Sequence, residues 1–241
     1  MGYAIKTENL IKRYKDKTAV DGLNLSVKEG ELIALLGVNG AGKTTTVKML
    51  TCLTKPSGGK AEIMGIDISK DPDGVKRLVG VSPQDTSVAE NLTVKENLEF
   101  MADLYLSKDK ARSSVERTIK AFGLAEFENK KAKLLSGGYK RKLSIAMAII
   151  GEPKVLFLDE PTLGLDVLAR RQLWHEIEAL KKDMTIVLTT HYMEEAQALA
   201  DRIVIMNGGC VMAVGTLAEL ENMTGKKGLE DVFVSIAERM E

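Results

Sequence analysis

The sequence has no excess of charge of either sign, and this limits its partners. Its 241 residues include 34 lysines and arginines and 34 aspartates and glutamates, so the formal net charge is zero at pH 7. Proteins that hold DNA, RNA or an anionic membrane through their overall field carry a basic excess. We therefore expect no nucleic acid partner and no direct electrostatic attachment to a membrane.

Cysteines and long hydrophobic runs are scarce as well. The two cysteines, Cys52 and Cys210, lie far apart and in no metal-ligand spacing, which suits a reducing cytosol but leaves a disulfide open. No apolar stretch approaches the roughly 18 residues of a membrane span, and residues 1–6 lack the apolar core of a signal peptide. Low-complexity segments and internal repeats are missing. These absences predict a soluble intracellular protein, long enough for one large domain or two small lobes.

A glycine-rich stretch at residues 37–45 is the centre of the chain. It follows the apolar run 32–36, which predicts a buried strand, and precedes 46–50, which predicts the start of a helix. Strand, glycine-rich turn with Gly-Lys-Thr, and helix together form the phosphate-binding P-loop, or Walker A motif. Its backbone can close around an anion at a helix N-terminus. The nucleotide-binding residues predicted here are Gly37, Asn39, Gly40, Ala41, Gly42, Lys43, Thr44 and Thr45.

Two side chains of this loop have individual roles. Lys43 supplies a point charge for the β- and γ-phosphates, and the Thr44 hydroxyl can reach a Mg²⁺ ion. The alternative is an ordinary glycine-rich turn before a helix, a pattern that chance produces in on the order of one chain in a hundred. The strand and helix on either side favour a nucleotide phosphate site.

The rest of the pattern predicts an α/β protein with a helical insertion. We expect one domain over residues 1–241, with an α/β core and N-terminal β subdomain at 1–84 and 153–220, a helical subdomain at 85–152 and a helical tail at 221–241. Strands are expected within 3–36 and at 61–64, 67–68, 78–82, 155–158, 185–190, 202–206 and 210–214. Helices are expected after the P-loop, across 93–135, and at 136–150, 167–182, 193–200, from 216 and at 229–239.

Polar residues follow the carboxyl ends of four predicted strands. The P-loop follows the first, Gln84 another, Asp159 and Glu160 a third, and His191 the last. In α/β sheets, ligands bind outside the carboxyl ends of the strands. We therefore expect these residues to converge on the phosphate site.

The pair Asp159-Glu160 after an apolar strand has the Walker B pattern. Asp159 would hold Mg²⁺ through water, and Glu160 can polarise the attacking water as a general base; the alternative is an acidic helix N-cap. Gln84 could touch Mg²⁺ or water and report the γ-phosphate to the insertion, or be a solvated loop residue. His191 could hydrogen-bond the γ-phosphate, or be structural. His175, in the middle of a predicted helix, receives no role.

The run Leu135-Ser136-Gly137-Gly138, ahead of Asp159-Glu160-Pro161-Thr162 and Leu165-Asp166, resembles the ATP-binding cassette family. The resemblance covers nearly the whole chain. It implies a P-loop NTPase core of the RecA-like type, with an antiparallel β subdomain and a helical signature-motif subdomain. It also implies roles in sequence order: Tyr14 stacks on adenine, Gln84 is the Q-loop, Ser136, Gly137 and Gly138 are the signature, Asp166 is the D-loop and His191 is the switch.

The resemblance further implies an ATPase that uses ATP and Mg²⁺, with Thr44, Gln84 and Asp159 near the metal. Two subunits would pair head-to-tail, each ATP lying between one subunit's Walker A and the other's signature. The signature opens a helix, so it is an anion site in its own right. Six basic residues surround it, either as attraction for the facing triphosphate or as a solvated basic face: Lys130, Lys131, Lys133, Lys140, Arg141 and Lys142.

The signature region also departs from the common pattern. Tyr139 stands where Gln is usual in the signature. In the D-loop pair Leu163-Gly164, Leu163 stands at the first position, where a small residue is frequent. Residues 139–143 and the tail 229–233 resemble exporters of the ABC-2 type and eukaryotic lipid exporters. The resemblance thus implies the ATPase subunit of an exporter, cytoplasmic and held on the inner face of the cell membrane by a separate permease. The alternatives are a non-transport cassette ATPase acting on DNA or the ribosome, a P-loop kinase, and a non-catalytic nucleotide-binding module.

Overall fold

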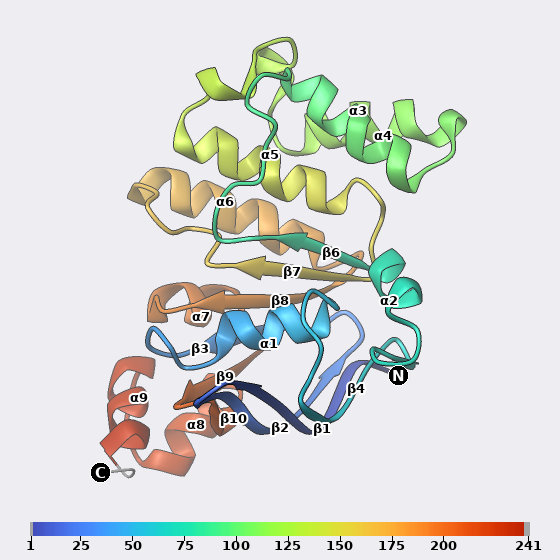
Figure 1. Cartoon of the computed structure of the whole chain (residues 1–241). Coiled ribbons are helices and arrows are strands. Elements are labelled where there is room, and N and C mark those ends of the chain that lie inside the picture. Colours follow the sequence, from blue (N-terminus) through green and yellow to red (C-terminus); the bar gives the residue numbers. More distant parts are fainter. Residues whose placement is uncertain (1, 239–241) are drawn as a thin grey trace.

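Two β-sheets form the frame of the molecule, which we describe from a computed structural model over residues 2–238 (Figure 1). The six-stranded sheet contains β3 (Leu32–Leu36), β6 (Val79–Ser82), β7 (Val155–Asp159), β8 (Thr185–Thr190), β9 (Arg202–Asn207) and β10 (Cys210–Gly215). Its order is β10-β9-β3-β8-β7-β6. The four-stranded sheet contains β1 (Tyr3–Tyr14), β2 (Lys17–Lys28), β4 (Gly58–Ile63) and β5 (Ile66–Asp67), in the order β2-β1-β4-β5.

The six-stranded sheet is parallel except at β10, which pairs antiparallel with β9. Strands β3, β7 and β8 are buried along their whole length. This explains why their sequences are continuous apolar runs, since both faces of a parallel sheet are covered. The carboxyl ends of the parallel strands therefore lie along one edge, which confirms the sheet on which the predicted site depends.

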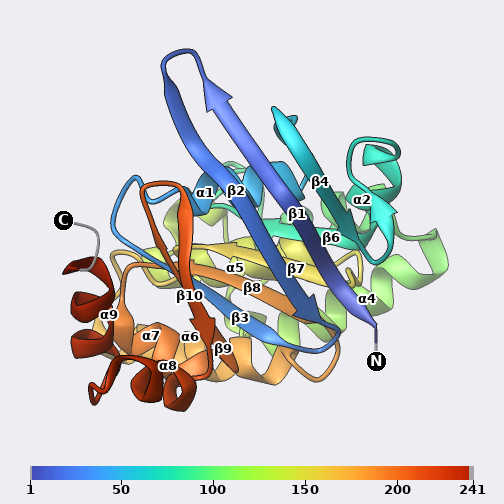
Figure 2. The ribbon, with the colours of Figure 1, turned by 90° about the horizontal axis from the view of Figure 1, so that it is seen from below.

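The two sheets enclose α1 (Lys43–Leu50), the helix that follows the P-loop. Alternate residues of β3 point to opposite sides: Ile33 and Leu35 join the core beneath the four-stranded sheet, and Leu32 joins the core on the helical side. The β1–β2 hairpin extends beyond the rest of the sheet at its tip (Figure 2). These contacts fix the P-loop between two rigid layers.

Helices occupy the opposite side of the six-stranded sheet (Figure 1). α6 (Val167–Leu180) and α7 (Met193–Leu199) pack against each other, and α8 (Leu217–Thr224) packs against α9 (Leu229–Glu238) beside β10. The outer layer contains α3 (Val94–Tyr105), α4 (Lys108–Ala121) and α5 (Gly137–Ile149). The apolar faces of these helices share one core with the sheet. Among residues 2–238, no helix combines the length and the apolar character needed to cross a bilayer.

Residues 3–36 contain strands β1, β2 and β3, in agreement with the several strands predicted there. The structure differs from the sequence prediction in two other segments. Helix α2 (Pro72–Leu78) was not predicted, because it is short and buries only Val75, so it carries no apolar period. The stretch 93–135 is not helical throughout: after α4 it forms two 3₁₀ turns, η1 (Ala125–Phe127) and η2 (Ala132–Leu134).

Local sequence signals explain several element boundaries. Thr93 forms a capping box with Glu96 at the start of α3. Thr216 and Glu219 form a second box at α8. A two-residue turn joins β9 and β10 in a hairpin. Arg239, the last residue of the predicted final helix, lies outside the described residues.

Candidate functional site

The P-loop lies between β3 and α1, and its backbone requires glycine at the helix entrance. Gly42 caps α1 in the left-handed region at φ 101°. A Cβ atom there would lie 2.6 Å from the carbonyl oxygen of Ala19 on β2, well inside contact distance. Only glycine avoids both the strain and the clash. The loop therefore presents its amide groups and the start of α1 to the same open space, which is the arrangement that binds phosphate.

Lys43 is a cation held inside this loop. Its side chain is 6% exposed, and its Nζ donates to the carbonyl oxygens of Gly37 (2.7 Å) and Val38 (3.3 Å). The same Nζ lies 3.5 Å from Glu160 Oε1. Lys43 therefore occupies the centre of the loop, where its charge can meet an anion bound to the loop amides.

Asp159 and Thr44 bring hard oxygen atoms to the edge of the loop. Thr44 Oγ1 donates to Asp159 Oδ1 at 3.1 Å, and the Thr189 hydroxyl of β8 donates to the same oxygen. Hydroxyl and carboxylate oxygens are the ligands that Mg²⁺ prefers, usually completed by water and nucleotide phosphates. The donor set thus fits Mg²⁺ held together with a nucleotide.

Glu160 has an unusual backbone conformation that aims its carboxylate at the site. Its φ is 50°, in a region that non-glycine residues rarely occupy, and its N–H donates to Thr189 O and Oγ1, both at 3.1 Å. Its Oε2 lies 2.7 Å from His191 Nδ1. The carboxylate is therefore held between a lysine and a histidine, and such strain is kept only where the surroundings enforce it.

His191 follows β8 and is partly exposed. Its ring packs on Tyr192 at a centroid distance of 4.1 Å, and the guanidinium of Arg170 lies over the Tyr192 ring at 4.9 Å. Thr190 Oγ1 accepts from the Tyr192 N–H at 2.9 Å. The imidazole is thus fixed from both sides and points one nitrogen at Glu160.

One cavity of about 530 Å³ gathers most of the predicted residues. The predicted residues that line it are Tyr14, Asn39, Gly40, Ala41, Gly42, Lys43, Thr44, Thr45, Gln84, Glu160 and His191. Gly37 lines a second cavity, which also touches His191, and Asp159 is buried behind Thr44. The structure therefore brings together the four strand ends, as we expected.

Some residues of the site were not predicted from the sequence. Lys17, Ala19 and Leu163 also line the cavity. Lys17 pairs with Tyr14 across the β1–β2 turn, and this hairpin position was its only sequence signal. Thr189 supports both Asp159 and Glu160, and its signal was a polar residue near the end of a buried strand.

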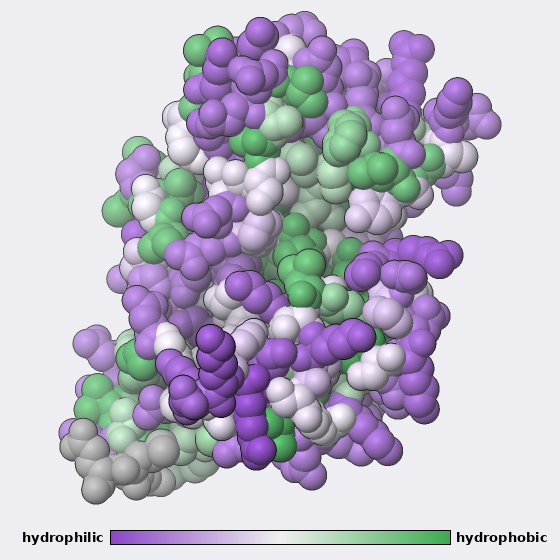
Figure 3. Space-filling view, viewed as in Figure 1, coloured by the Kyte–Doolittle hydropathy of each residue, from purple (hydrophilic) through white to green (hydrophobic). Residues whose placement is uncertain are grey.

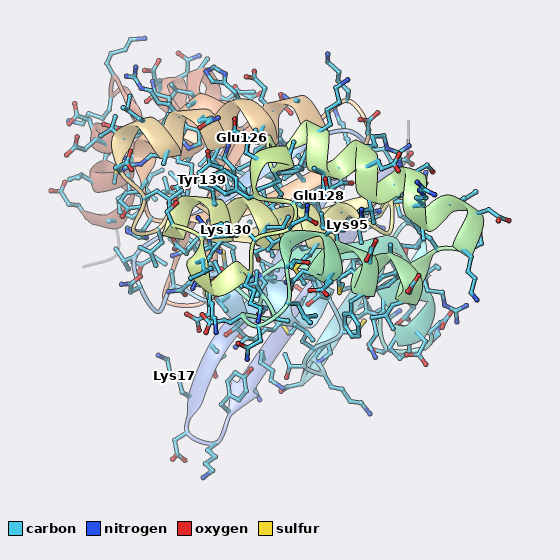
Figure 4. All side chains as sticks on the ribbon, turned by 90° about the horizontal axis from the view of Figure 1, so that it is seen from above. Lys17, Lys95, Glu126, Glu128, Lys130 and Tyr139 are labelled. Atoms are coloured by element: carbon cyan, nitrogen blue, oxygen red, sulfur yellow. The ribbon has the colours of Figure 1, made fainter. Side chains whose placement is uncertain are left out.

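The predicted signature and D-loop residues do not line this cavity. Ser136 caps α5, with its hydroxyl accepting from the Tyr139 N–H at 3.5 Å, and Ser136 and Gly137 are exposed. Asp166 caps α6 by accepting from the N–H groups of Leu168 and Ala169. Figure 4 shows Tyr139 among the outer helices, well apart from Lys17 at the hairpin. Within one chain, the signature lies away from the P-loop.

Three of the basic residues around the signature are paired with other segments of the same chain. Lys140 pairs with Glu90 at 2.9 Å, and Lys142 pairs with Glu176 at 2.6 Å in a buried contact. Arg141 is 4% exposed, and burial lowers its pKa. Its guanidinium donates to the carbonyl oxygens of Pro83 and Gln84, which ties α5 to the segment after β6. These partners come from distant segments, so the local sequence could not reveal them.

Tyr139, the unusual residue after the signature glycines, packs within the outer layer. Its ring lies 4.2 Å from that of Phe127 between centroids, and Lys142 Nζ lies 5.6 Å above it. Lys130 Nζ lies 5.4 Å from the Phe127 ring centre. The aromatic pair therefore anchors the start of α5 to η1.

Comparisons with known proteins agree with this geometry. The family described as "ABC transporter" matches residues 20–163. The chain is 44% identical to the daunorubicin/doxorubicin resistance ATP-binding protein DrrA of Streptomyces peucetius, over 94% of this chain and 69% of that protein. It is 45% identical to human phospholipid-transporting ATPase ABCA3 over 92% of this chain, but this covers only 13% of ABCA3.

Solved structures show the same fold. An ATP-binding subunit of an ABC transporter superposes with a TM-score of 0.88 at 30% identity, over 97% of this chain and 99% of that one. A dimeric ATP-binding cassette in a post-hydrolysis state, bound to ADP and Pi, superposes with a TM-score of 0.80 at 28% identity, over 88% of this chain and 98% of that one.

Proposed function

Since the chain belongs to the ABC transporter family, as an ATP-binding and ATP-hydrolysing subunit, we propose that it powers an exporter whose membrane permease is a separate chain. Support comes from relatives named for daunorubicin resistance and for phospholipid transport. The subunit would be cytoplasmic and held on the inner face of the cell membrane by that permease. These relatives do not support the alternative of a non-transport cassette ATPase that acts on nucleic acid or the ribosome.

The contact between Glu160 and His191 carries the catalytic part of the proposal. When bound, Mg²⁺ and the triphosphate supply the charge and the phosphoryl group for transfer. Glu160 takes the proton of the attacking water with a carboxylate held next to His191 Nδ1 at 2.7 Å. His191 orients that carboxylate and extends toward the γ-phosphate position. Tyr14 stacks on the base, and Gln84 senses the site from the loop after β6.

Lys43, Thr44 and Asp159 would hold the charged part of the nucleotide. The Lys43 ammonium, now bonded to loop carbonyls, is positioned to meet the β- and γ-phosphates. The oxygen atoms of Thr44 and Asp159, 3.1 Å apart, would share Mg²⁺ directly or through water.

We propose that a second subunit completes the site head-to-tail. The start of α5 at Ser136 and Gly137 is an exposed helix N-terminus, able to bind an anion, and it does not line the phosphate cavity of the same chain. Asp166, at the cap of α6, would lie near the same interface. The dimeric cassette with bound ADP and Pi is a relative that assembles in pairs.

The permease would bind in an apolar groove between the outer helices and the sheets. A cavity of about 370 Å³ is lined by Val81, Met101 and Tyr105, and Leu53 at its edge is 66% exposed. Figure 3 shows apolar surface in the hollow between the upper helices and the rest of the molecule. Exposed apolar surface of this kind marks a protein contact. We propose that residues 85–152 move as a subdomain when the permease is bound in this groove.

Co-purification with the permease tests this proposal. A membrane protein encoded beside this chain would be co-expressed with it, and Met101→Arg should reduce the amount of subunit recovered while ATP binding stays unchanged. Val234→Arg, at an apolar residue that is 44% exposed on α9, is the matched control. Full recovery of the Met101→Arg subunit would contradict the docking site, and the absence of any co-purifying membrane protein would contradict the exporter.

A further inference from the structure

A buried carboxyl group lies beside the catalytic residues without belonging to the phosphate cavity. Glu195, on α7, has no exposed surface, and its Oε1 accepts from Trp174 Nε1 on α6 at 3.1 Å. Trp174 is the single tryptophan of the chain. Burial of a carboxyl is costly, so a residue kept here needs a compensating role.

Two threonine hydroxyls complete the surroundings of this carboxyl. Burial raises the pKa of Glu195, while the nearby hydroxyls of Thr190 and Thr162 and the Trp174 N–H lower it by a smaller amount. Within residues 2–238, neither Glu195 Oε2 nor Thr162 Oγ1 makes a hydrogen bond of regular geometry. Burial thus favours the protonated acid, whose O–H can donate to a threonine hydroxyl.

The two threonines belong to the segments that carry the proposed catalytic residues. Thr162 lies two residues after Glu160, in a turn where the Leu163 N–H donates to Glu160 O. Thr190 directly precedes His191, and its hydroxyl accepts from the Tyr192 N–H on the other side of the histidine. The Glu195 carboxyl therefore lies beside a hydroxyl of each segment, while Trp174 connects it to α6.

We propose that Glu195 is a positioning residue for ATP hydrolysis, which fixes the segments of Glu160 and His191 relative to each other through Thr162, Thr190 and Trp174. The inference rests on the proposed roles of Glu160 and His191. This role predicts that replacing Glu195 changes turnover rather than nucleotide affinity. The interactions of Glu195 are with Trp174, Thr162 and Thr190, and none of these residues belongs to the P-loop. A purely structural core residue would instead affect the whole fold.

Three variants test this role. Glu195→Ala should lower kcat by about 10²-fold, the size expected when catalytic groups shift by about 1 Å, with little change in KM for ATP. Glu195→Gln, which keeps a neutral group with a donor and an acceptor, should restore most of kcat. Glu194→Gln is the matched control, because this neighbouring carboxylate is 82% exposed and should leave kcat unchanged.

The fluorescence of Trp174 gives a readout that does not depend on turnover. Glu195→Ala should shift its emission, since the indole N–H loses its partner, and Glu195→Gln should keep it. If Glu195→Ala does not fold, Thr162→Val removes one contact of the same group and should lower kcat with unchanged KM. Unchanged kcat in these variants, or a loss of ATP affinity equal to the loss of kcat, would overturn the inference. Full activity in Glu160→Gln would instead overturn the catalytic roles on which it rests.

Discussion

Gly42 is the residue where backbone conformation most directly limits the site. Its φ of 101° and the 2.6 Å approach of Ala19 O exclude any side chain. We expect Gly42→Ala to abolish ATP binding and to destabilise the fold by about 1–3 kcal/mol, measured by titration calorimetry and thermal unfolding. Gly58→Ala on β4 is the control, because its Cβ would lie at an ordinary 3.8 Å from Ile11 Cδ1. ATP binding by Gly42→Ala would contradict this account of the loop.

Glu160→Gln should separate binding from hydrolysis. The amide keeps the shape of the side chain but cannot take a proton, so kcat should fall by about 10²- to 10⁴-fold. ATP binding should remain, because Lys43 and the loop amides are untouched. Single-turnover hydrolysis and equilibrium binding measure the two quantities. Glu178→Gln, at an exposed carboxylate of α6, is the control; normal turnover in Glu160→Gln would show that another group acts as base.

The buried Glu195 also predicts a pH dependence of stability. Its pKa is raised in the folded state by burial, so the folded protein binds this proton more tightly than the unfolded chain. The carboxyl therefore lowers the free energy of unfolding as pH rises from its unfolded pKa through its folded pKa. Relative to the native chain, Glu195→Gln should gain stability over this range, measured by urea unfolding between about pH 5 and 8. A difference that does not vary with pH would contradict it.

Individual site residues could be predicted from the sequence where the residues that act together are close in the sequence. The P-loop residues and the pair Asp159-Glu160 were identified because their neighbours in sequence are also their neighbours in the site. Thr189 was missed, because its contact with Asp159 joins two strands that only the sheet brings together. The contact of Glu195 with Trp174 was missed for the same reason.

At the scale of elements, a buried ion pair joins α5 to α6. The side chains of Lys142 and Glu176 are 6% and 14% exposed and lie 2.6 Å apart. Removing one partner leaves the other buried alone, so Lys142→Met should lower the free energy of unfolding by about 3–5 kcal/mol. The double variant Lys142→Met, Glu176→Leu should recover most of this loss, since two apolar groups replace the pair.

The exposed pair on the same helix provides the control for this prediction. Lys140 pairs with Glu90, which is 62% exposed, so Lys140→Met should cost at most about 1 kcal/mol. Urea unfolding of the three variants measures the differences. Equal losses for Lys142→Met and Lys140→Met would show that burial does not strengthen the inner pair.

Elements were predicted best where burial leaves a clear pattern. Strands β3, β7 and β8 are covered on both faces and therefore stood out as apolar runs. Helix α2 was missed because it buries a single side chain. The segment after α4 was predicted as helix, but its turns are held by backbone contacts with the start of α3. Lys131 forms an isolated antiparallel β-bridge with Thr93 there. Such contacts have no local sequence signal.

At the scale of the whole molecule, the parts of the proposed site lie in two places. The six-stranded sheet collects the strand ends around one cavity, as the positions of the polar residues after the predicted strands indicated. The start of α5 with Ser136 lies on the outer helical layer, outside that cavity. The arrangement within one chain could be predicted from the polar residues that follow the strands, whereas the pairing of two chains depends on surfaces that a single sequence does not bring together.

The most direct test is the sedimentation of the Glu160→Gln protein with saturating MgATP. A site shared by two copies predicts a dimer, and adding Ser136→Arg should return it to monomer while each copy still binds ATP. Ser107→Arg, the same change at the exposed cap of α4, should leave the dimer intact. An ATP-dependent dimer that persists with Ser136→Arg, or a Glu160→Gln protein that stays monomeric with ATP bound, would contradict the shared site.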